Sequence, residues 1–435
     1  MALGATAVAQ APPGVIVDEC TESAFRTAVA AAAPGTTITF GCDGTITLTA
    51  AGGETPITID KSLILDGTGR EVAISGGDAV SLFFATNRAT FTLRNLTLRD
   101  GTGVDFGGGQ SNGGAVYNTA TLIAENVDFV SNSALGSGGA ILSFGSGASL
   151  SVTNSSFSGN EGNCGFFCTT GFSASDGAGG AIGVASRGAT TITNSVFTAN
   201  KMSGRGSGGA IGAIHNFNAN TDGPVTIIDS TFKDNVVVAL SQGNGRRVGG
   251  GAVSASNHDL TITGSTFEGN TVSSSGPQVA GGAVLIHGEA IEGDLPLKQA
   301  SISASTFTAN AASGISSGGA IDIVRVLTSV TDSTFSDNTA SRGGAISVSG
   351  APLDIAGSLI QRNTATGASG DPIAGGVDSF GGTVSFTGTD VFDNVGGNCG
   401  LRAAGESAGD IVDRGATPSD RARPAGSTDS RASRS

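Results

Sequence analysis

Two short motifs that recur together along most of the chain constrain its fold more than any other feature. Each copy opens with Gly-Gly-Ala and an aliphatic residue, as in Gly343-Gly344-Ala345-Ile346, and closes with a large apolar residue three positions before an asparagine. Nine copies can be counted between residues 113 and 394, and the shortest spans 25 residues. Such a regular self-repeat indicates units that cannot bury their apolar face alone and that stack on one another.

The apolar residues within each copy alternate with a period of two. Ile321 and Ile323 follow one opening, and Leu260 and Ile262 precede one closing, which is typical of short strands with one buried face. No window of the repeat keeps a helical period, and glycine recurs too often for a helix. The sequence therefore predicts an all-β parallel solenoid. Because strand-to-parallel-strand crossovers favour one hand, we expect a right-handed β-helix.

Stacking would place the same side chain above itself in successive units. We expect the closing aromatic residues to form a ladder inside the column. The asparagines would form a second ladder at a turn, since asparagine tolerates a left-handed backbone and can hydrogen-bond to the units above and below. Ile360 and Val391 replace phenylalanine in the last two copies. The predicted ladder residues are Phe129, Phe157, Phe197, Phe232, Phe267, Phe307 and Phe335, with Asn132, Asn160, Asn200, Asn235, Asn270, Asn310, Asn338, Asn363 and Asn394.

The copies differ in length because of insertions at two corners of the predicted column, where solenoids usually carry functional loops. The longest insertion, residues 162–178, carries Phe166, Phe167 and Phe172. These rings either form an exposed contact surface or pack back on the column. The ninth copy opens at Gly375 and has Val377 where the others have alanine.

The rest of the chain is arranged around the repeats. Residues 1–11 are small and apolar and look like the end of a secretory signal. Within residues 12–100, a helix predicted over 21–33 would cap the first rungs of the column. Residues 101–400 form the repeat column. Residues 401–435 have few large aliphatic side chains and are predicted to be a disordered tail.

Five cysteines indicate an oxidising compartment if they pair. We predict one disulfide between Cys20 and Cys42 and another between Cys164 and Cys168. Cys399 is left over, and we expect any partner of it to lie in a region absent from this chain.

The net charge of −14 argues against nucleic acids and anionic membranes as partners. No apolar run approaches the roughly 18 residues that a membrane-spanning helix needs.

An enzyme on such a column needs carboxylates with lysine or arginine on adjacent rungs. The best candidates are Asp322 and Arg325, and Asp322 should point outward because its neighbours Ile321 and Ile323 point inward. The neighbouring rungs offer no second carboxylate at that position. The sequence therefore favours a solvated surface residue and leaves catalysis uncertain, with binding preferred.

Three histidines, His215, His258 and His287, fall on successive rungs, six to eight residues after each Gly-Gly. They would form a metal or acid–base site only if they shared a register, and their spacing differs by one each time.

Calcium is the one cofactor for which the sequence offers a weak case. Asp234, Asp337 and Asp393 lie just before closing asparagines and carry the oxygen ligands that calcium prefers. The nonapeptide calcium repeat is absent, however. We therefore predict no metal and no cofactor.

The pairing of Gly-Gly-Ala-Ile with Phe-x-x-Asn resembles the repeats of polymorphic outer-membrane proteins. The order Cys20, helix, Cys42, followed by Ile57-Thr58-Ile59 and Leu63-x-Leu65-Asp66-Gly67, looks like the start of large secreted bacterial proteins of the pectate-lyase-like β-helix superfamily. These resemblances imply a secreted or cell-surface β-helix that acts as an adhesin-like binding or structural element, with surface glycans or proteins as partners. The alternatives are a polysaccharide-active lyase or glycoside hydrolase, and a fragment of a larger surface protein.

Overall fold

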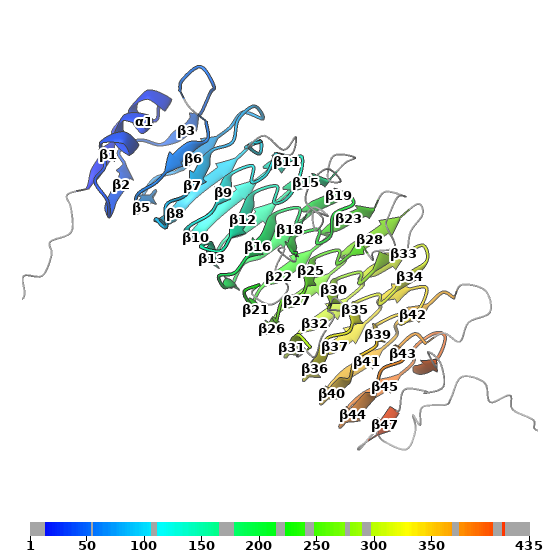
Figure 1. Ribbon diagram of the computed structural model, residues 1–435. Coiled ribbons are helices and arrows are strands. Elements are labelled where there is room, and N and C mark those ends of the chain that lie inside the picture. The colour runs from blue at the N-terminus through cyan, green and yellow to red at the C-terminus, as the bar shows by residue number, and fades with distance from the viewer. Residues whose placement is uncertain are drawn as a thin grey trace, which may run out of the picture.

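Parallel strand pairing stacks the repeat units into a right-handed β-helix, as predicted (Figure 1). The computed structural model describes residues 14–53, 55–105, 111–164, 178–214, 222–239, 248–274, 279–288, 297–367, 374–402 and 411–413. The chain starts at the capped end of the column and advances one rung per repeat toward the other end. Each rung contributes strands to three faces, which we call face 1, face 2 and face 3.

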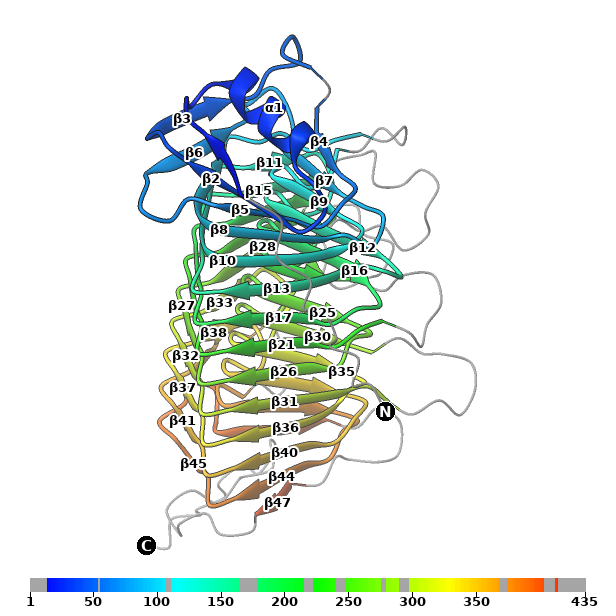
Figure 2. The same cartoon turned by 90° about the vertical axis from the view of Figure 1, so that its left-hand side faces the viewer.

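Face 1 is a single stack of parallel strands that runs the length of the column (Figure 2). It starts with β1, whose pairing to β2 is also parallel. Its strands are β1 (Val15–Val17), β2 (Thr36–Phe40), β5 (Leu63–Asp66), β8 (Thr90–Arg99), β10 (Thr121–Val130), β13 (Ser149–Thr153), β17 (Thr190–Thr193), β21 (Val225–Ile228), β26 (Leu260–Thr263), β31 (Gln299–Ser303), β36 (Leu327–Thr331), β40 (Leu353–Ala356), β44 (Val384–Thr387) and β47 (Ile411–Asp413).

Face 2 follows face 1 in each rung after a tight turn, and the long strands β8 and β10 run through both faces. The other strands of face 2 are β3 (Gly44–Thr47), β6 (Val72–Ser75), β14 (Ser156–Ser158), β18 (Val196–Thr198), β22 (Thr231–Lys233), β27 (Thr266–Glu268), β32 (Thr306–Thr308), β37 (Thr334–Ser336), β41 (Leu359–Gln361) and β45 (Asp390–Phe392).

Face 3 contains the strands that follow the Gly-Gly-Ala motifs, and strands without the motif extend it at both ends of the column. Its strands are β4 (Ile57–Ile59), β7 (Phe83–Ala85), β9 (Val116–Asn118), β12 (Ile141–Gly145), β16 (Ile182–Ser186), β20 (Ile211–Ala213), β25 (Val253–Ser256), β30 (Val284–His287), β35 (Ile321–Val324), β39 (Ile346–Ser349), β43 (Val377–Phe380) and β46 (Cys399–Arg402).

The interior of the column is a ladder of identical side chains. Seven phenylalanines, Phe129 to Phe335, stack with ring centroids 4.5 to 4.8 Å apart and planes within 7° of parallel. Each ring lies in register with the ring of the next rung, and all are fully buried. The closing phenylalanine of the repeat is therefore the main core residue of face 2.

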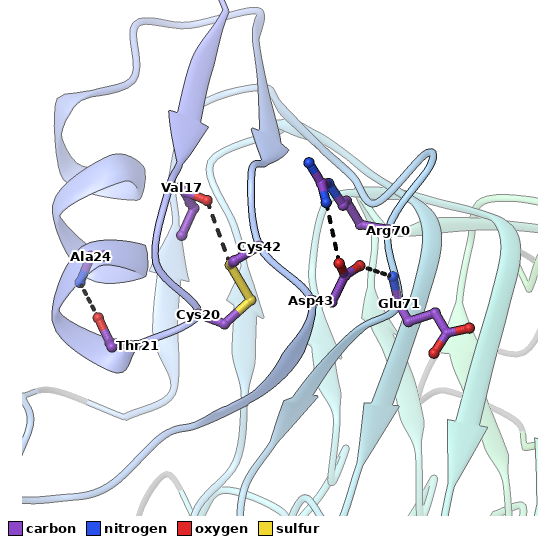
Figure 3. Close-up of a disulfide and its surroundings, with 8 residues drawn as sticks. All are labelled: Val17, Cys20, Thr21, Ala24, Cys42, Asp43, Arg70 and Glu71. Carbon is purple, nitrogen blue, oxygen red and sulfur yellow. Dashed lines mark hydrogen bonds and ion pairs between the residues drawn. A yellow bond between two sulfur atoms is a disulfide. The ribbon is translucent and has the colours of Figure 1, made fainter.

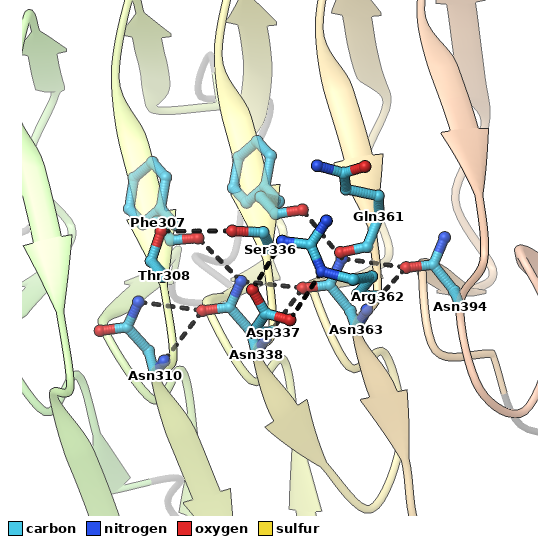
Figure 4. A network of polar contacts seen from close by, with 11 residues as sticks. Phe307, Thr308, Asn310, Ser336, Asp337, Asn338, Gln361, Arg362, Asn363 and Asn394 are labelled. Atoms are coloured by element: carbon cyan, nitrogen blue, oxygen red, sulfur yellow. Dashed lines mark hydrogen bonds and ion pairs between the residues drawn. The ribbon is translucent and has the colours of Figure 1, made fainter.

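The closing asparagines form a hydrogen-bonded ladder from Asn132 to Asn394, which is buried as far as Asn363 (Figure 4). The backbone N–H and the side-chain amide of Asn338 both donate to Oδ1 of Asn363, at 3.0 and 2.8 Å. The same amide donates to the carbonyl of Phe307 in the rung before, at 2.9 Å. Each asparagine in the ladder therefore hydrogen-bonds to the rung before it and to the rung after it.

Buried serines form a second ladder at the turn between faces 1 and 2. The N–H of Ser230 donates to Oγ of Ser265 at 3.1 Å, and that hydroxyl donates to the carbonyl of Thr263 at 2.9 Å. The residues just before these serines, such as Asp229 at φ 49°, adopt the left-handed region. The turn between faces 1 and 2 and the turn that follows face 2 are thus both fixed by side chains.

The Gly-Gly pair is required by close backbone contact between rungs. Gly250 has φ 68°, and a Cβ on Gly251 would collide with the backbone of Gly282 and of Thr271. The register of β39 with β43 changes our interpretation of the ninth copy. Val377 pairs with Ile346 rather than with Ala345, so Gly375 occupies the second glycine position.

A side sheet and a second small core lie between each closing asparagine and the next Gly-Gly, where the sequence suggested only corner loops. The chain runs out along the side sheet and returns through a short outer strip. Between them lies a separate apolar cluster that includes Met202, Val237 and Val279. The side-sheet strands are β11 (Ser133–Ala134), β15 (Glu161–Cys164), β19 (Lys201–Gly204), β23 (Val236–Ala239), β28 (Thr271–Ser274), β33 (Ala311–Ser313), β38 (Thr339–Ala340) and β42 (Thr364–Ala365), and the outer-strip strands are β24 (Val248–Gly249), β29 (Val279–Ala280) and β34 (Ser316–Ser317).

The predicted helix caps the first rungs as α1 (Glu22–Ala31), and Thr21 is its N-cap. Phe25 is fully buried and packs against Phe40 and Phe83, with centroids 6.2 and 6.3 Å away. The predicted disulfide joins Cys20, just before the helix, to Cys42, just after β2 (Figure 3). This confirmed bond ties the cap to the first strands of face 1.

The column continues beyond the predicted boundary at residue 400. β46 ends at Arg402, and β47 pairs in parallel with β44. The aliphatic residues Leu401, Ile411 and Val412 lie in these two strands. The remainder of the predicted tail and residues 1–11 lie outside the described residues.

Candidate functional site

The carboxylate that the sequence placed on a solvated surface is buried. Asp322 is 0 % exposed, although Arg325, which follows β35, is exposed. Gly212, which is in register with Asp322 three rungs earlier, shows why this position is buried. A Cβ on Gly212 would meet the backbone of Ser207 and Ala178, so the segment before each Gly-Gly lies against the outer side of face 3. The prediction that Asp322 is solvated is therefore wrong.

Sequence reasoning also missed Asp378, a second buried carboxylate two rungs away. It aligns with Ser347, which aligns with Asp322, and it is 2 % exposed. Asp378 does not stand out in a comparison of Asp322 with its adjacent rungs, because Ser347 lies between the two aspartates. Both carboxyl groups lie under the outer layer of face 3, where an extended substrate cannot reach them.

Two of the three predicted histidines lie in the part of the chain that the structure describes. His215 lies outside the described residues, and His287 ends β30. His258 is buried, and its ring nitrogens lie 2.7 Å from the carbonyl of Gly223 and 3.2 Å from that of Ile214. The ring therefore contacts the chain on both sides of an insertion in the preceding rung. Among the residues that the structure describes, no group of three or more His, Cys, Asp or Glu is placed to hold a metal ion.

The three aspartates weighed as calcium ligands precede the closing asparagines in left-handed backbone, at Asp234, Asp337 and Asp393. The guanidinium of Arg362 donates to both carboxylate oxygens of Asp337, at 3.0 and 2.9 Å (Figure 4). This hydrogen-bonded pair lowers the pKa of Asp337 below its ordinary value. The carboxylate of Asp337, one of the three considered as calcium ligands, is thus occupied by an ion pair between rungs. The absence of a cofactor stays a prediction.

An open groove of about 920 Å³ lies over the second half of face 1. Its floor consists of outward side chains from four successive strands, in register with one another. These floor residues are Thr261 of β26, Ser301 of β31, Ser329 of β36 and Asp354 of β40. Three of the four are uncharged hydroxyl side chains.

Aliphatic side chains line the edge of this groove where the strands of face 1 begin. Leu297 is 42 % exposed and Leu327 is 37 % exposed, and Pro352 lies beside them. The N–H of Leu327 donates to the carbonyl of Lys298 at 3.0 Å, which holds the two rungs together at this edge. The groove therefore offers an apolar wall beside a polar floor.

Three charged side chains line the groove, namely Asp259, Lys298 and Asp354. Asp259 accepts a hydrogen bond from the N–H of Gln299 at 2.9 Å, and Asp354 accepts one from Ser385. Three rungs separate these two aspartates, which is about 14 Å along the column. Glycoside hydrolases place their carboxyl groups about 5 to 9.5 Å apart. These two aspartates therefore lie too far apart to act as such a pair.

A second open hollow, of about 1310 Å³, lies over the first rungs of face 2. The N–H of Glu71 and the guanidinium of Arg70 donate to Asp43, which lowers the pKa of this carboxyl group. Asn126 donates to Asn95, which in turn donates to Asp66. Much of this polar lining is engaged in internal hydrogen bonds, so we regard the groove over face 1 as the better candidate site.

The contact loop predicted from Phe166, Phe167 and Phe172 lies outside the described residues. Cys164 at the end of β15 is disulfide-bonded, and its predicted partner Cys168 also lies outside them. Cys399 begins β46, is half-buried and packs against the core of the column.

The comparison with known families gives one match. A model of the Chlamydia polymorphic membrane protein repeat matches residues 332–349. The matched stretch contains Phe335, Asn338 and Gly343, which are ladder and crossover residues of one unit. The match indicates the same kind of repeat and suggests a surface-exposed bacterial protein.

No curated protein and no solved structure matches the chain. In the described part of the chain, no helix is both long and apolar enough to cross a membrane.

Proposed function

We propose that this protein is a surface-exposed, adhesin-like β-helix that attaches to an uncharged polysaccharide lying along the groove over face 1. The observation that carries the proposal is the groove itself, with hydroxyl groups on its floor and leucines on its wall. The match to a polymorphic membrane protein repeat supports the surface location. The repeat residues supply a rigid column, and the outward residues supply the contacts.

The chemistry of the groove favours a neutral polymer. Sugar hydroxyl groups can exchange hydrogen bonds with Thr261, Ser301 and Ser329, and their C–H faces can cover Leu297 and Leu327. An anionic polymer would meet Asp259, Asp354 and the field of a chain with net charge −14, and Lys298 is the single cation in the groove lining. Because the groove floor spans four rungs, a polymer chain can contact more of the floor than a single sugar can.

Replacing Leu327 with arginine should reduce polysaccharide binding about tenfold or more, because a charged side chain replaces apolar wall that the polymer covers. The measurement is depletion of the full chain from solution by a panel of insoluble neutral polysaccharides. Leu135→Arg is the matched control, since Leu135 is 63 % exposed and does not line the groove. Equal binding by the two variants, or no binding by the parent chain to any neutral polysaccharide, would contradict the proposal.

A further inference from the structure

Outward side chains of face 1 form two parallel files of hydroxyl groups across six strands, which we call the hydroxyl lattice. Strand register aligns each residue with its counterpart in the next rung. Eleven of the twelve positions are serine or threonine, and none is charged or aromatic. The first file is Ser151, Thr191, Thr226, Thr261, Ser301 and Ser329, and the second is Thr153, Thr193, Ile228, Thr263, Ser303 and Thr331.

The spacing of the lattice is regular in two directions. Neighbours in a file are about 4.8 Å apart because they lie on adjacent strands, and partners on one strand are about 6.6 Å apart because they are two residues apart. The strands of face 1 stack in line across these rungs (Figure 2). The asparagine and serine ladders fix the turns of the same rungs, so the hydroxyl groups sit on a rigid support.

Face 2 shows that an uncharged surface is not a general property of the column. On the same rungs, its outward positions include Lys233 of β22 and Glu268 of β27, which form an ion pair at 3.0 Å. Phe232 and Phe267, between the outward residues of these strands, point inward to the same core. On face 1, eleven of the twelve lattice positions carry hydroxyl groups and the twelfth is Ile228.

We propose that the hydroxyl lattice binds ice, an activity that goes beyond attachment to polysaccharide. Ice presents water oxygens on a fixed lattice whose repeats are also a few ångströms long. Hydroxyl groups can take the place of water in that lattice, and threonine methyl groups fit between its rows. Charged groups hold liquid-like hydration shells, and none of the twelve lattice positions carries a charge, which suits the lattice to a frozen surface. Because the support is rigid, little conformational entropy is lost on binding.

The chemistry of the lattice separates it from the polysaccharide groove. The groove is lined by Thr261, Ser301 and Ser329 of the first file and by none of the second file. Over β13, β17 and β21, the lattice lies outside the groove lining and has no aromatic platform on which a sugar could stack. An ordered water lattice needs neither a recess nor such a ring, and it gains contacts with every rung.

The test compares the full chain with a double variant, Thr193→Tyr and Thr226→Tyr, in the middle of the lattice. The matched control carries Thr198→Tyr and Thr231→Tyr, which lie on face 2 of the same two rungs. Thermal hysteresis, inhibition of ice recrystallisation and partition into a slowly growing ice front are measured for each. We expect the parent chain and the control to be active in all three measurements. The activity of the lattice variant should be lower by about tenfold or more.

A second lattice variant, Thr193→Lys and Thr226→Lys, covers the case in which tyrosine disturbs the fold. Circular dichroism and the urea midpoint should match the parent chain, while ice activity is lost. Absence of ice activity in the parent chain, or equal losses in the lattice variants and the face 2 control, overturns the proposal. Polysaccharide depletion by the lattice variants should stay at the parent level, so a failure of the groove and a failure of the lattice are distinguishable.

Discussion

Replacing Asn235 with leucine should lower the free energy of unfolding by about 3 to 5 kcal/mol, because it removes three buried hydrogen bonds and puts an apolar side chain among their polar groups. The backbone N–H and side-chain amide of Asn200 both donate to Oδ1 of Asn235, at 3.0 and 2.9 Å. The amide of Asn235 in turn donates to the carbonyl of Phe197 at 2.9 Å. Leucine has a similar size but supplies neither the acceptor nor the donor.

The urea midpoint, followed by far-ultraviolet circular dichroism, measures this loss. Asn194→Gly is the control, because Asn194 is exposed, has φ 47° and lies at the other turn, where glycine adopts that backbone without strain. We expect the control to stay within about 1 kcal/mol of the parent chain. If Asn235→Leu unfolds at the same urea concentration as the control, the asparagine ladder does not stabilise the column.

Among substitutions that add a single methyl group, we expect the largest decrease in the free energy of unfolding at the second glycine of a Gly-Gly pair. A Cβ on Gly251 would lie 2.6 Å from the amide nitrogen and 2.7 Å from the carbonyl oxygen of Thr271, and closer still to the carbonyl of Gly282. All three atoms belong to backbone that is held by neighbouring rungs, so they cannot move aside cheaply. Gly251→Ala should therefore cost about 4 kcal/mol or more.

Gly147→Ala provides the contrast for this experiment. A Cβ there would meet only the carbonyl of Thr119, at 3.6 Å, which is ordinary contact, and the backbone is not left-handed. The control should be neutral or slightly more stable, by about 0.5 kcal/mol. Urea unfolding and limited proteolysis of both variants give the answer. A Gly251→Ala chain as stable as Gly147→Ala would show that the rungs are not packed this closely.

The sequence predicted the column because its central signals are local and repeated. Alternating residues such as Ile321 and Ile323 identify a strand, and the fixed spacing from Phe335 to Asn338 places the same turn in every rung. The helix cap and the Cys20–Cys42 bond were predictable for a similar reason, since both depend on residues close together in the chain.

The side sheet was missed because its apolar residues are short runs inside stretches of variable length. Val237 lies in a strand of four apolar residues and Val279 in a strand of two, and such short runs cannot be distinguished from a loop by sequence alone. The burial of Asp322 could not be predicted for the same reason, because the layer that covers face 3 belongs to this unrecognised part of each rung.

The groove could not be predicted because its residues come from rungs of different length. Leu297 and Leu327 lie 30 residues apart, and Thr261 and Ser301 lie 40 residues apart, yet strand register brings each pair onto adjacent rungs. The signal that could have located the groove is the combination of exposed leucines at one edge of face 1 with hydroxyl groups beside them.

Hydroxyl-radical footprinting of the full chain, free and bound to a neutral polysaccharide, tests the central claim that the groove over face 1 is the binding site. The account predicts that Leu297 and Leu327 become protected from oxidation on binding, while the exposed side chains Leu135 and Val395 remain as reactive as in the free chain. Protection of Leu135 or Val395, with Leu297 and Leu327 unchanged, would contradict it and place the binding site elsewhere on the column.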